Sequence, residues 1–367
     1  MEDPALWIAL RDTPGLSRTQ ARDLLRLFGT PERIFGRSVA NLGAAGSLSA
    51  TVHLSRGPDL RRARGELARA REVGLELLLQ GSPRFPPLLL EISDPPILLY
   101  LRGHLPEGPF VSVVGSRRAT PRGREVARRF SAALARAGAV VVSGLAYGID
   151  AAAHAGALDA GAGTVAVLAS GLDRPGPAGN RRLARRILRQ GGAWLSEQPP
   201  GTSPRTYHFP DRNRLISGLS RATLIVEARE RSGSLWTARH AADQGRDVLV
   251  VPGPVDTDAC RGSNRLLVDG AIAVIDEDDT VAAALGRLGW PPPGPASELG
   301  PLPEGDGGRI FRRVQRGPCG PDELVGELGL PPARVAALLV DLELEGWITR
   351  EGRRIACGSR PARGSRA

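Results

Sequence analysis

The chain has 367 residues and a hydrophobic fraction of 41%, enough for two or three soluble domains, one with a sizeable core. All 49 basic residues are arginines, which excludes chemistries that need a Walker A, Schiff-base or kinase lysine. The formal net charge of +10 predicts a polyanionic partner, because the guanidinium group binds phosphate through a planar fork.

Several common classes of site and location are not indicated. No apolar stretch reaches the length of a membrane span, and the acidic start lacks the basic segment of a secretory signal, so we expect a cytoplasmic protein without membrane contact. The three cysteines have no metal-binding spacing, and the five histidines form no HExxH pair. We therefore expect no metal site.

Residues 1–80 are expected to form an N-terminal helical module. Helix-spaced apolar residues occur at 6–10, 21–28 and 31–35, with a Pro-Gly turn between the first two. Residues 16–25 resemble a helix-hairpin-helix, whose turn can hold a DNA phosphate. A compact module for packing or partner contact, similar to a SAM domain, is the alternative that we favour.

Residues 81–290 predict an α/β domain. Short segments rich in Val and Ile occur at 110–114, 139–142, 164–168, 193–196, 223–226, 247–251 and 271–275. Helical stretches lie between them at 123–136, 150–160, 180–189, 214–219 and 235–244. This alternation is typical of an extended Rossmann-type, doubly wound, mostly parallel sheet. Right-handed crossovers then place the loops that follow the strands at one edge, where such sheets bind ligands.

The C-terminal part predicts a linker, a small domain and a tail. Residues 291–307 are rich in Pro and Gly and cannot build a core. Residues 308–358 resemble a winged helix, with helices at 310–314, 322–328 and 331–345 and a hairpin at 347–356. The third helix offers only Arg334 against three carboxylates, which favours protein contact over DNA reading. Residues 359–367 are expected to be a disordered basic tail.

Two glycine loops follow the first two strands of the predicted sheet. Gly115-Ser116-Arg117-Arg118 can bring backbone, hydroxyl and guanidinium groups to a phosphate, although a tight turn with surface arginines is the alternative. The segment is neither GxGxxG nor a P-loop. In the second loop we assign Gly144 to the anion and Asp150 to the cap of the following helix.

Residues 205–214 give the strongest indication of nucleic-acid binding. Phe209 can stack on a base, and Arg205, Arg212 and Arg214 can cover adjacent phosphates. Asn213 can contact a base edge or hold the loop. The alternative is that the aromatic residue only plugs the domain and that one arginine pairs with a carboxylate.

Later loops add to the same edge. Ser232 and Gly233 precede a predicted helix and can face an anion, and Asn264 lies in a segment that we place in a further loop. Asp173, Glu197 and Glu227 would invite acid–base catalysis. No histidine pairs with them in the sequence pattern, so we favour a role in capping helices and holding arginines.

The motifs together resemble the DNA-processing protein DprA (Smf) family over residues 85–275. The resemblance depends on the following segments: Phe85-Pro86-Pro87-Leu88-Leu89, Asp94-Pro95-Pro96, Val114-Gly115-Ser116-Arg117, Ser143-Gly144-Leu145-Ala146-Tyr147-Gly148-Ile149-Asp150, Phe209-Pro210-Asp211-Arg212-Asn213-Arg214, Ser232-Gly233-Ser234-Leu235 and Val251-Pro252-Gly253. The flanking helical and winged-helix modules also look like those of longer family members.

The resemblance implies a non-catalytic dimer without a cofactor that binds and protects single-stranded DNA. It further implies that the dimer transfers the strand to the recombinase RecA and helps RecA to displace single-strand binding protein, in natural transformation or in DNA repair. It also implies that Arg117 holds a phosphate, that Phe209 stacks near a base, and that Arg212, Asn213 and Arg214 complete the pocket. Many members carry a lysine where this chain has Thr206, and Arg205 is the candidate replacement. Gly176-Pro177 replaces a Tyr-Pro of the family, so no role is carried over to that loop.

A nucleotide hydrolase similar to the cytokinin-activating phosphoribohydrolases is the rival hypothesis. Such enzymes have related sheets and carry a PGGxGTxxE signature. Here the corresponding segment, Val251-Pro252-Gly253-Pro254, stops after one glycine, which disfavours the enzyme.

Overall fold

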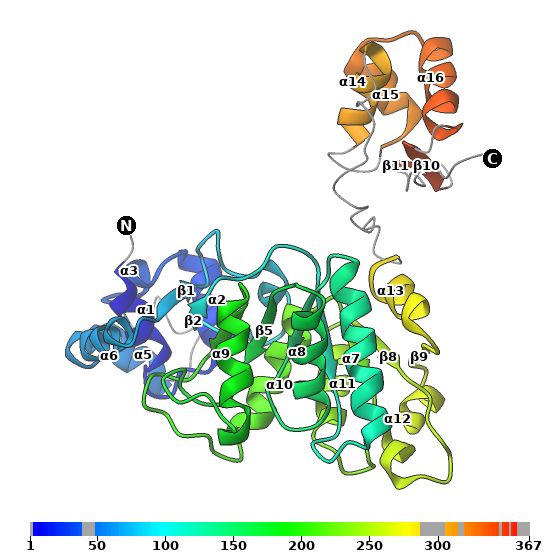
Figure 1. The fold of residues 1–367 in the computed structure, drawn as a ribbon. Helices are drawn as coiled ribbons and strands as arrows, with labels where there is room; N and C mark the ends of the chain where they lie inside the picture. Colours follow the sequence, from blue (N-terminus) through cyan, green and yellow to red (C-terminus); the bar gives the residue numbers. More distant parts are fainter. Residues whose placement is uncertain are drawn as a thin grey trace. The chain divides into compact units, whose positions relative to one another are not determined.

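The computed structural model describes residues 3–38, 48–286, 305–314, 319–344, 347–351 and 354–357. The chain divides into two compact units, Met1–Ala284 and Leu285–Ala367, which are described separately here. Figure 1 shows the elements of both units.

The first unit is built on a sheet with nine strands in its described part, in the order β1-β2-β6-β5-β4-β3-β7-β8-β9. Neighbouring strands from β6 to β9 in this order are parallel, which confirms the predicted mostly parallel fold. The strands are β1 (Glu76–Leu79), β2 (Leu98–Gly103), β3 (Phe110–Val114), β4 (Val140–Ser143), β5 (Thr164–Val167), β6 (Ala193–Ser196), β7 (Ala222–Ile225), β8 (Asp247–Val250) and β9 (Ile272–Ala273).

Two strands were not predicted. β1 and β2 are antiparallel to their neighbours and extend the sheet beyond β6. β1 lies before residue 81, so the sheet begins inside the segment that the sequence assigned to the N-terminal module. β1 is short, and prolines precede β2 in the sequence. A search for alternating strands and helices therefore missed both strands.

Helices cover both faces of the sheet (Figure 1). α7 (Pro121–Arg136), α8 (Ile149–Asp159) and α9 (Arg181–Arg189) pack in sequence on one face, and α10 (His208–Leu219) and α11 (Ser234–Asp243) pack together on the other. β4, β5, β6 and β7 have four buried residues each, which explains why their sequences are apolar or small throughout. The single-turn helices η1 (Pro87–Leu90) and η2 (Ala178–Asn180), with α12 (Asp258–Val268) and α13 (Glu277–Leu285), complete the unit.

The N-terminal helices pack against the β1–β2 end of this sheet. They are α1 (Pro4–Arg11), α2 (Arg18–Phe28), α3 (Pro31–Ile34), α5 (Leu48–Arg56) and α6 (Leu60–Glu72). α2 begins with a capping box in which Ser17 and Gln20 exchange hydrogen bonds. Trp7 and Leu24 belong to the same apolar cluster as Tyr100 of β2 and Trp194 of β6, so the module and the sheet share a core.

The second unit is a winged helix, as predicted. α14 (Gly305–Val314), α15 (Pro321–Leu328) and α16 (Pro332–Leu344) precede the hairpin of β10 (Ile348–Glu351) and β11 (Arg354–Cys357). Phe311 packs edge-to-face on Trp347 in its core. Residues 291–304 of the predicted linker and the whole predicted tail lie outside the described residues. Residues 305–307, which were assigned to the linker, belong to α14, so the first helix of this unit begins earlier than predicted.

Candidate nucleic-acid interface

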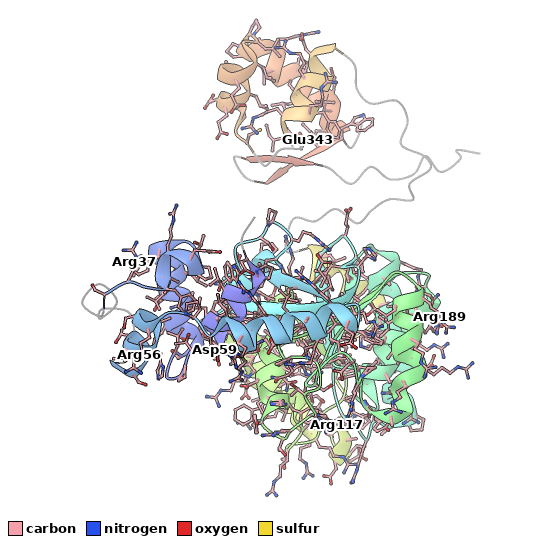
Figure 2. The ribbon with its side chains drawn as sticks, turned by 90° about the vertical axis from the view of Figure 1, so that its left-hand side faces the viewer. Arg37, Arg56, Asp59, Arg117, Arg189 and Glu343 are labelled. Carbon is pink, nitrogen blue, oxygen red and sulfur yellow. The ribbon has the colours of Figure 1, made fainter. Side chains whose placement is uncertain are left out.

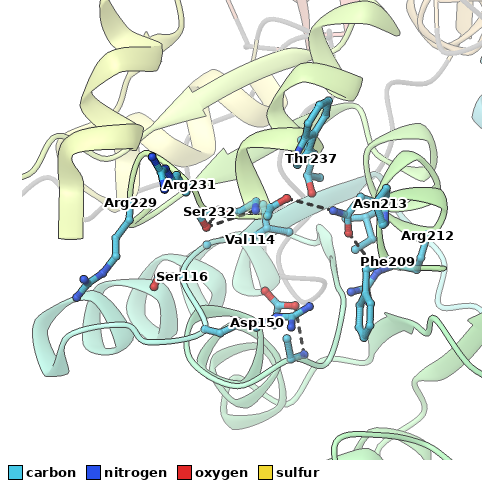
Figure 3. A pocket seen from close by; sticks show the side chains of 18 of the residues that line it. Val114, Ser116, Asp150, Phe209, Arg212, Asn213, Arg229, Arg231, Ser232 and Thr237 are labelled. Atoms are coloured by element: carbon cyan, nitrogen blue, oxygen red, sulfur yellow. Dashed lines mark hydrogen bonds between the residues drawn. The ribbon is translucent and has the colours of Figure 1, made fainter. Parts of the chain in front are cut away.

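A cavity of about 680 Å³ opens where the chain reverses its direction across the sheet. β3 is followed along the chain by strands on one side, and β7 then pairs with β3 on its other side. The loops that follow β3 and β7 therefore diverge and leave a crevice, which is the usual ligand site of such sheets. We call this the switch-point cavity; its lining includes Gly115, Ser116, Arg117, Arg118, Asp150, Phe209, Arg212, Asn213, Arg229, Arg231, Ser232, Gly233 and Trp236 (Figure 3).

Arg117 and Phe209 form one wall of this cavity. Arg117 is exposed in the loop after β3, and its guanidinium carbon lies 4.7 Å from the centroid of the Phe209 ring. Phe209 comes from the first turn of α10. The two residues, 92 positions apart in the numbering, thus present a stacked cation and aromatic plane to the opening.

Arg212 is the buried member of the site. Its Nη1 donates to the carbonyl oxygens of Gly144, at 2.7 Å, and Val167, at 2.6 Å. Burial lowers the pKa of Arg212 to about 10, and Arg117 adds to this decrease while Asp150 opposes it. The guanidinium is therefore still a cation at neutral pH, and it ties the ends of β4 and β5 to the head of α10.

The backbone groups of Gly144 make hydrogen bonds within the protein, so its N–H is not available to an anion, contrary to the prediction. Its N–H donates to Asp150 Oδ2 at 3.2 Å and its carbonyl accepts from Arg212. Asp150 was expected to cap α8, but its side chain makes no capping hydrogen bond. It accepts instead from the N–H groups of Gly144 and Ala146, each at 3.2 Å. Burial raises the pKa of the Asp150 carboxyl, and Arg212 opposes this increase. These two residues shape the loop after β4.

Gly115 and Ser116 shape the loop after β3 in a similar way. A Cβ at Gly115 would lie 2.6 Å from Ile149 Cγ1, so only glycine allows this packing. Ser116 donates its N–H to the Glu227 carbonyl and accepts the Arg118 N–H at its hydroxyl oxygen. Both residues line the cavity, but their polar backbone groups are partly engaged within the protein.

Asn213 connects α10 with the loop before α11. Its Nδ2 donates to the Gly233 carbonyl at 3.2 Å, and its Oδ1 accepts from Arg212 Nε at 3.2 Å. The hydroxyl groups of Ser232 and Ser234 are 2.7 Å apart at the start of α11. Asn213, Ser232 and Gly233 are thus brought to the same cavity, as the sequence analysis expected.

Three predicted residues lie elsewhere. Arg214 is buried and donates to Glu197 Oε2 at 2.5 Å and to the Asp94 carbonyl at 2.8 Å, away from the cavity. Asn264 lies in α12, not in a loop, and its side chain bonds both the N–H and the carbonyl of Gly253. Arg205 is exposed and donates to the Tyr207 hydroxyl; its neighbour Thr206 lines the cavity instead.

Sequence reasoning missed Arg229, Arg231 and Trp236. The two arginines lie in the loop after β7 and are exposed; Trp236 lies in the first turn of α11 with 54% of its surface exposed. Arginines at alternate positions just before Ser232-Gly233-Ser234 were a signal that could have identified them. Among the described residues, neither arginine has a carboxylate partner within ion-pair distance.

The carboxylates near this edge have structural partners. Glu227 accepts from the Thr120 hydroxyl at 2.6 Å, which fixes the start of α7. Glu197 is bound by Arg214, and Asp173 accepts the N–H of Gly201 at 2.8 Å. In the described ranges, no group of three or more His, Cys, Asp or Glu side chains could hold a metal ion. None of the helices in those ranges is long and apolar enough to cross a bilayer.

Comparisons with known proteins identify two matching families. A family model described as DNA recombination-mediator protein A matches residues 76–285, and one described as DprA winged helix domain matches residues 291–352. Protein Smf of Escherichia coli is 38% identical over 278 residues, 74% of each chain. A DNA processing protein DprA of Mycobacterium tuberculosis, named as such on a provisional basis, is 42% identical over 263 residues, 70% of this chain and 67% of the relative.

Two solved structures are similar to the chain. DNA processing protein A from Streptococcus pneumoniae aligns with a TM-score of 0.66 and 31% identity, covering 77% of this chain and 98% of that one. DNA processing protein A from Helicobacter pylori, whose structure is described for its single-stranded DNA binding mode, aligns with a TM-score of 0.51 and 30% identity. That alignment covers 57% of this chain and 94% of the other.

Proposed function

The chain belongs to the DNA recombination-mediator protein A (DprA) family, and we propose on this basis that it binds single-stranded DNA, with little regard to sequence, in the switch-point cavity. The observation that carries the proposal is the stacked pair of Arg117 and Phe209 at the wall of an open cavity of about 680 Å³. An unpaired strand offers both a phosphate for the cation and a base face for the ring.

The charge of the cavity supports a polymer of phosphates as the ligand. Arg117, Arg118, Arg229 and Arg231 are all exposed in its lining, and none of them has a carboxylate ion-pair partner among the described residues. Asp150 is the one carboxylate in the described lining, and it is buried. We propose that the exposed arginines hold successive phosphates and that Phe209 and Trp236 stack on bases.

The cellular role that we propose follows from the family. We infer that the protein protects unpaired DNA and loads the RecA recombinase onto strands covered by single-strand binding protein, in natural transformation or DNA repair. We propose that the protein carries out this role in the cytoplasm, as a homodimer. Its test is RecA filament formation on strands precoated with single-strand binding protein, which the protein should accelerate; an unchanged lag would contradict the role.

We propose that the protein is not an enzyme. Glu197, Glu227 and Asp173 each hold an arginine, a helix start or a loop, which leaves none of them placed as a free general acid or base. The rival nucleotide hydrolase would release base from nucleoside monophosphates. Chromatography of such incubations checks this hypothesis directly, and base release without oligonucleotide binding would reverse the ranking.

Binding itself is tested by fluorescence anisotropy with a labelled oligothymidine, a mixed-sequence single strand and a blunt duplex. We expect similar affinities for the two single strands and clearly weaker binding to the duplex, because a duplex hides the base faces that Phe209 needs. Equal affinity for the duplex would contradict the proposed mode.

A further inference from the structure

A second cavity, of about 200 Å³, adjoins the switch-point cavity. The two share Arg117, Ala146, Phe209 and Arg212, so the stacked cation and ring form a common wall. We call it the Tyr147 cavity, after the tyrosine in its lining. Figure 3 shows Phe209 and Arg212 in the lining of the switch-point cavity.

The lining of the Tyr147 cavity has the chemistry of a nucleobase pocket. Leu168, Pro177 and Pro204 supply apolar walls, and the side chain of Tyr147 is 49% exposed. The Tyr147 hydroxyl accepts the N–H of Gly179 at 3.3 Å, so the ring is held at the rim. A fixed aromatic face with cations at one end suits a stacked base that is followed by a phosphate.

A basic helix begins directly beyond this cavity. Among the arginines of α9, Arg186 pairs with Asp159 at 2.8 Å. The exposed arginines of α9 have no ion-pair partner among the described residues; they are Arg181, Arg182, Arg185 and Arg189. Figure 2 labels Arg189 and Arg117, which both belong to the first unit. This face carries positive charge that nothing described in the chain neutralises.

The loop that carries Tyr147 is tied to the start of α9. Asn180 donates through Nδ2 to the carbonyls of Leu145, at 2.9 Å, and Ala146, at 3.1 Å. Arg181 and Arg182 follow Asn180 directly in the sequence. The cavity and the basic face are therefore held in one arrangement by hydrogen bonds.

We infer that a second nucleobase of the bound strand occupies the Tyr147 cavity, across the Arg117–Phe209 wall from the first, and that the phosphates beyond it lie along the arginines of α9. This inference rests on the proposed binding of single-stranded DNA and assigns the path of the strand.

The base pocket is tested with Tyr147→Ala and Tyr147→Phe. Loss of the ring should weaken binding of a 20-nucleotide oligothymidine by about 5- to 150-fold, the equivalent of roughly 1–3 kcal/mol of stacking. The salt slope should stay unchanged, because Tyr147 contacts no phosphate. Tyr147→Phe keeps the ring and should bind nearly as wild type. Tyr207→Ala, at an exposed tyrosine outside both cavities, is the matched control and should bind as wild type.

The α9 path is tested with the triple variant Arg181→Gln, Arg182→Gln, Arg185→Gln. For a 30-nucleotide strand, the slope of log affinity against log salt should become shallower by about 2, because three phosphates lose their cations at roughly 0.7 each. Arg61→Gln, Arg64→Gln, Arg71→Gln removes the same charge from exposed positions of α6 and should leave the slope nearly unchanged. Equal slopes for the two triple variants would overturn the path.

The outcomes separate this inference from the proposed function. If wild type binds and Arg117→Ala binds weakly, but Tyr147→Ala matches wild type, the second base pocket is wrong and the proposed function stands. If wild type shows no binding to single strands, both are wrong. A Tyr147-dependent affinity for free thymidine monophosphate, with oligonucleotide affinity independent of Tyr147, would show a mononucleotide site and overturn the inference.

Discussion

Arg212 fills the space beside the α-carbon of Gly144, because a Cβ built at position 144 would lie 2.2 Å from Arg212 Nη1 and 2.6 Å from its Cζ. The guanidinium cannot retreat easily, since Nη1 is bonded to two carbonyl oxygens. The loop after β4 and the head of α10 are therefore fitted to each other, and a change in one must move the other.

We accordingly expect Gly144→Ala to displace Arg212, to weaken oligothymidine binding and to cost about 1–3 kcal/mol of stability through overpacking. Gly65→Ala is the matched control. Gly65 lies inside α6, where the new methyl group would be 3.9 Å from the Arg69 guanidinium, so that helix should gain up to about 1 kcal/mol. Urea denaturation and anisotropy check both variants. A Gly144→Ala protein with wild-type affinity and stability would show that Arg212 is not fixed as described.

Arg117→Ala should weaken binding of single strands and make the slope of log affinity against log salt shallower by about 0.7, because one phosphate contact is lost. The Phe209 ring should also lose its cation, 4.7 Å away in the wild type. Arg136→Ala removes an exposed arginine from the last turn of α7 and should change neither quantity much. Titrations at several salt concentrations measure the slope, and identical slopes for the two variants would place the phosphate elsewhere.

Much of the fold was predictable because burial leaves a plain trace in the sequence. β4 reads Val-Val-Val-Ser, and all four residues are buried, so an apolar run between helical patterns identified a sheet with helices on both faces. β1 and β2 escaped detection because β1 is only four residues long and the two strands are antiparallel, so no α-helix lies between them to complete the alternation of strand and helix. The family motifs were correct as well, since the family model and the relatives confirm the resemblance.

The site was harder to predict because α10 begins at His208, six residues earlier than expected. Pro210 is tolerated in its first turn, where backbone N–H groups have no partner within the helix. On a helix, Phe209, Arg212 and Asn213 share a face at spacings of three and four, whereas Arg214 points elsewhere. A segment read as a loop gave no reason to separate Arg214 from the others.

We therefore expect Arg214 to contribute to the free energy of unfolding and not to the salt dependence of single-strand binding. Its guanidinium is buried between Asp94 and Glu197, with Nε 3.1 Å from Asp94 Oδ2. Arg214→Ala removes the buried partner of these carboxylates and leaves them, among the described residues, only the longer ion pairs with Arg18, at 3.5 Å and 3.6 Å. The change should cost up to about 3 kcal/mol of unfolding free energy, the lower end of the range for breaking a buried pair. The folded fraction should keep the wild-type salt slope for single strands. A stable Arg214→Ala protein with a shallower slope would return Arg214 to the binding site.

The last prediction concerns acid stability and His154, which is fully buried in α8. Thr164 gives its hydroxyl hydrogen to the Val141 carbonyl, so the imidazole Nδ1 donates to Thr164 Oγ1 at 2.9 Å. Nε2 is buried and has no hydrogen-bond partner within the part of the chain that the structure describes. Burial, with a smaller contribution from Arg212, lowers the pKa of His154 from 6.5 to about 3.

Between those two pKa values the unfolded chain binds a proton that the folded protein does not bind, so His154 makes stability decrease as the pH falls below about 6.5. At pH 5 the loss from this group is about 2 kcal/mol, at 1.36 kcal/mol per pH unit. His154→Asn keeps an N–H that can reach Thr164 and cannot titrate. Urea denaturation at pH 7 and pH 5 should therefore show a drop smaller by about 2 kcal/mol in the variant than in wild type. Equal drops would mean that the imidazole is protonated in the folded protein, and the buried neutral ring at the α8–β5 contact would be the wrong description.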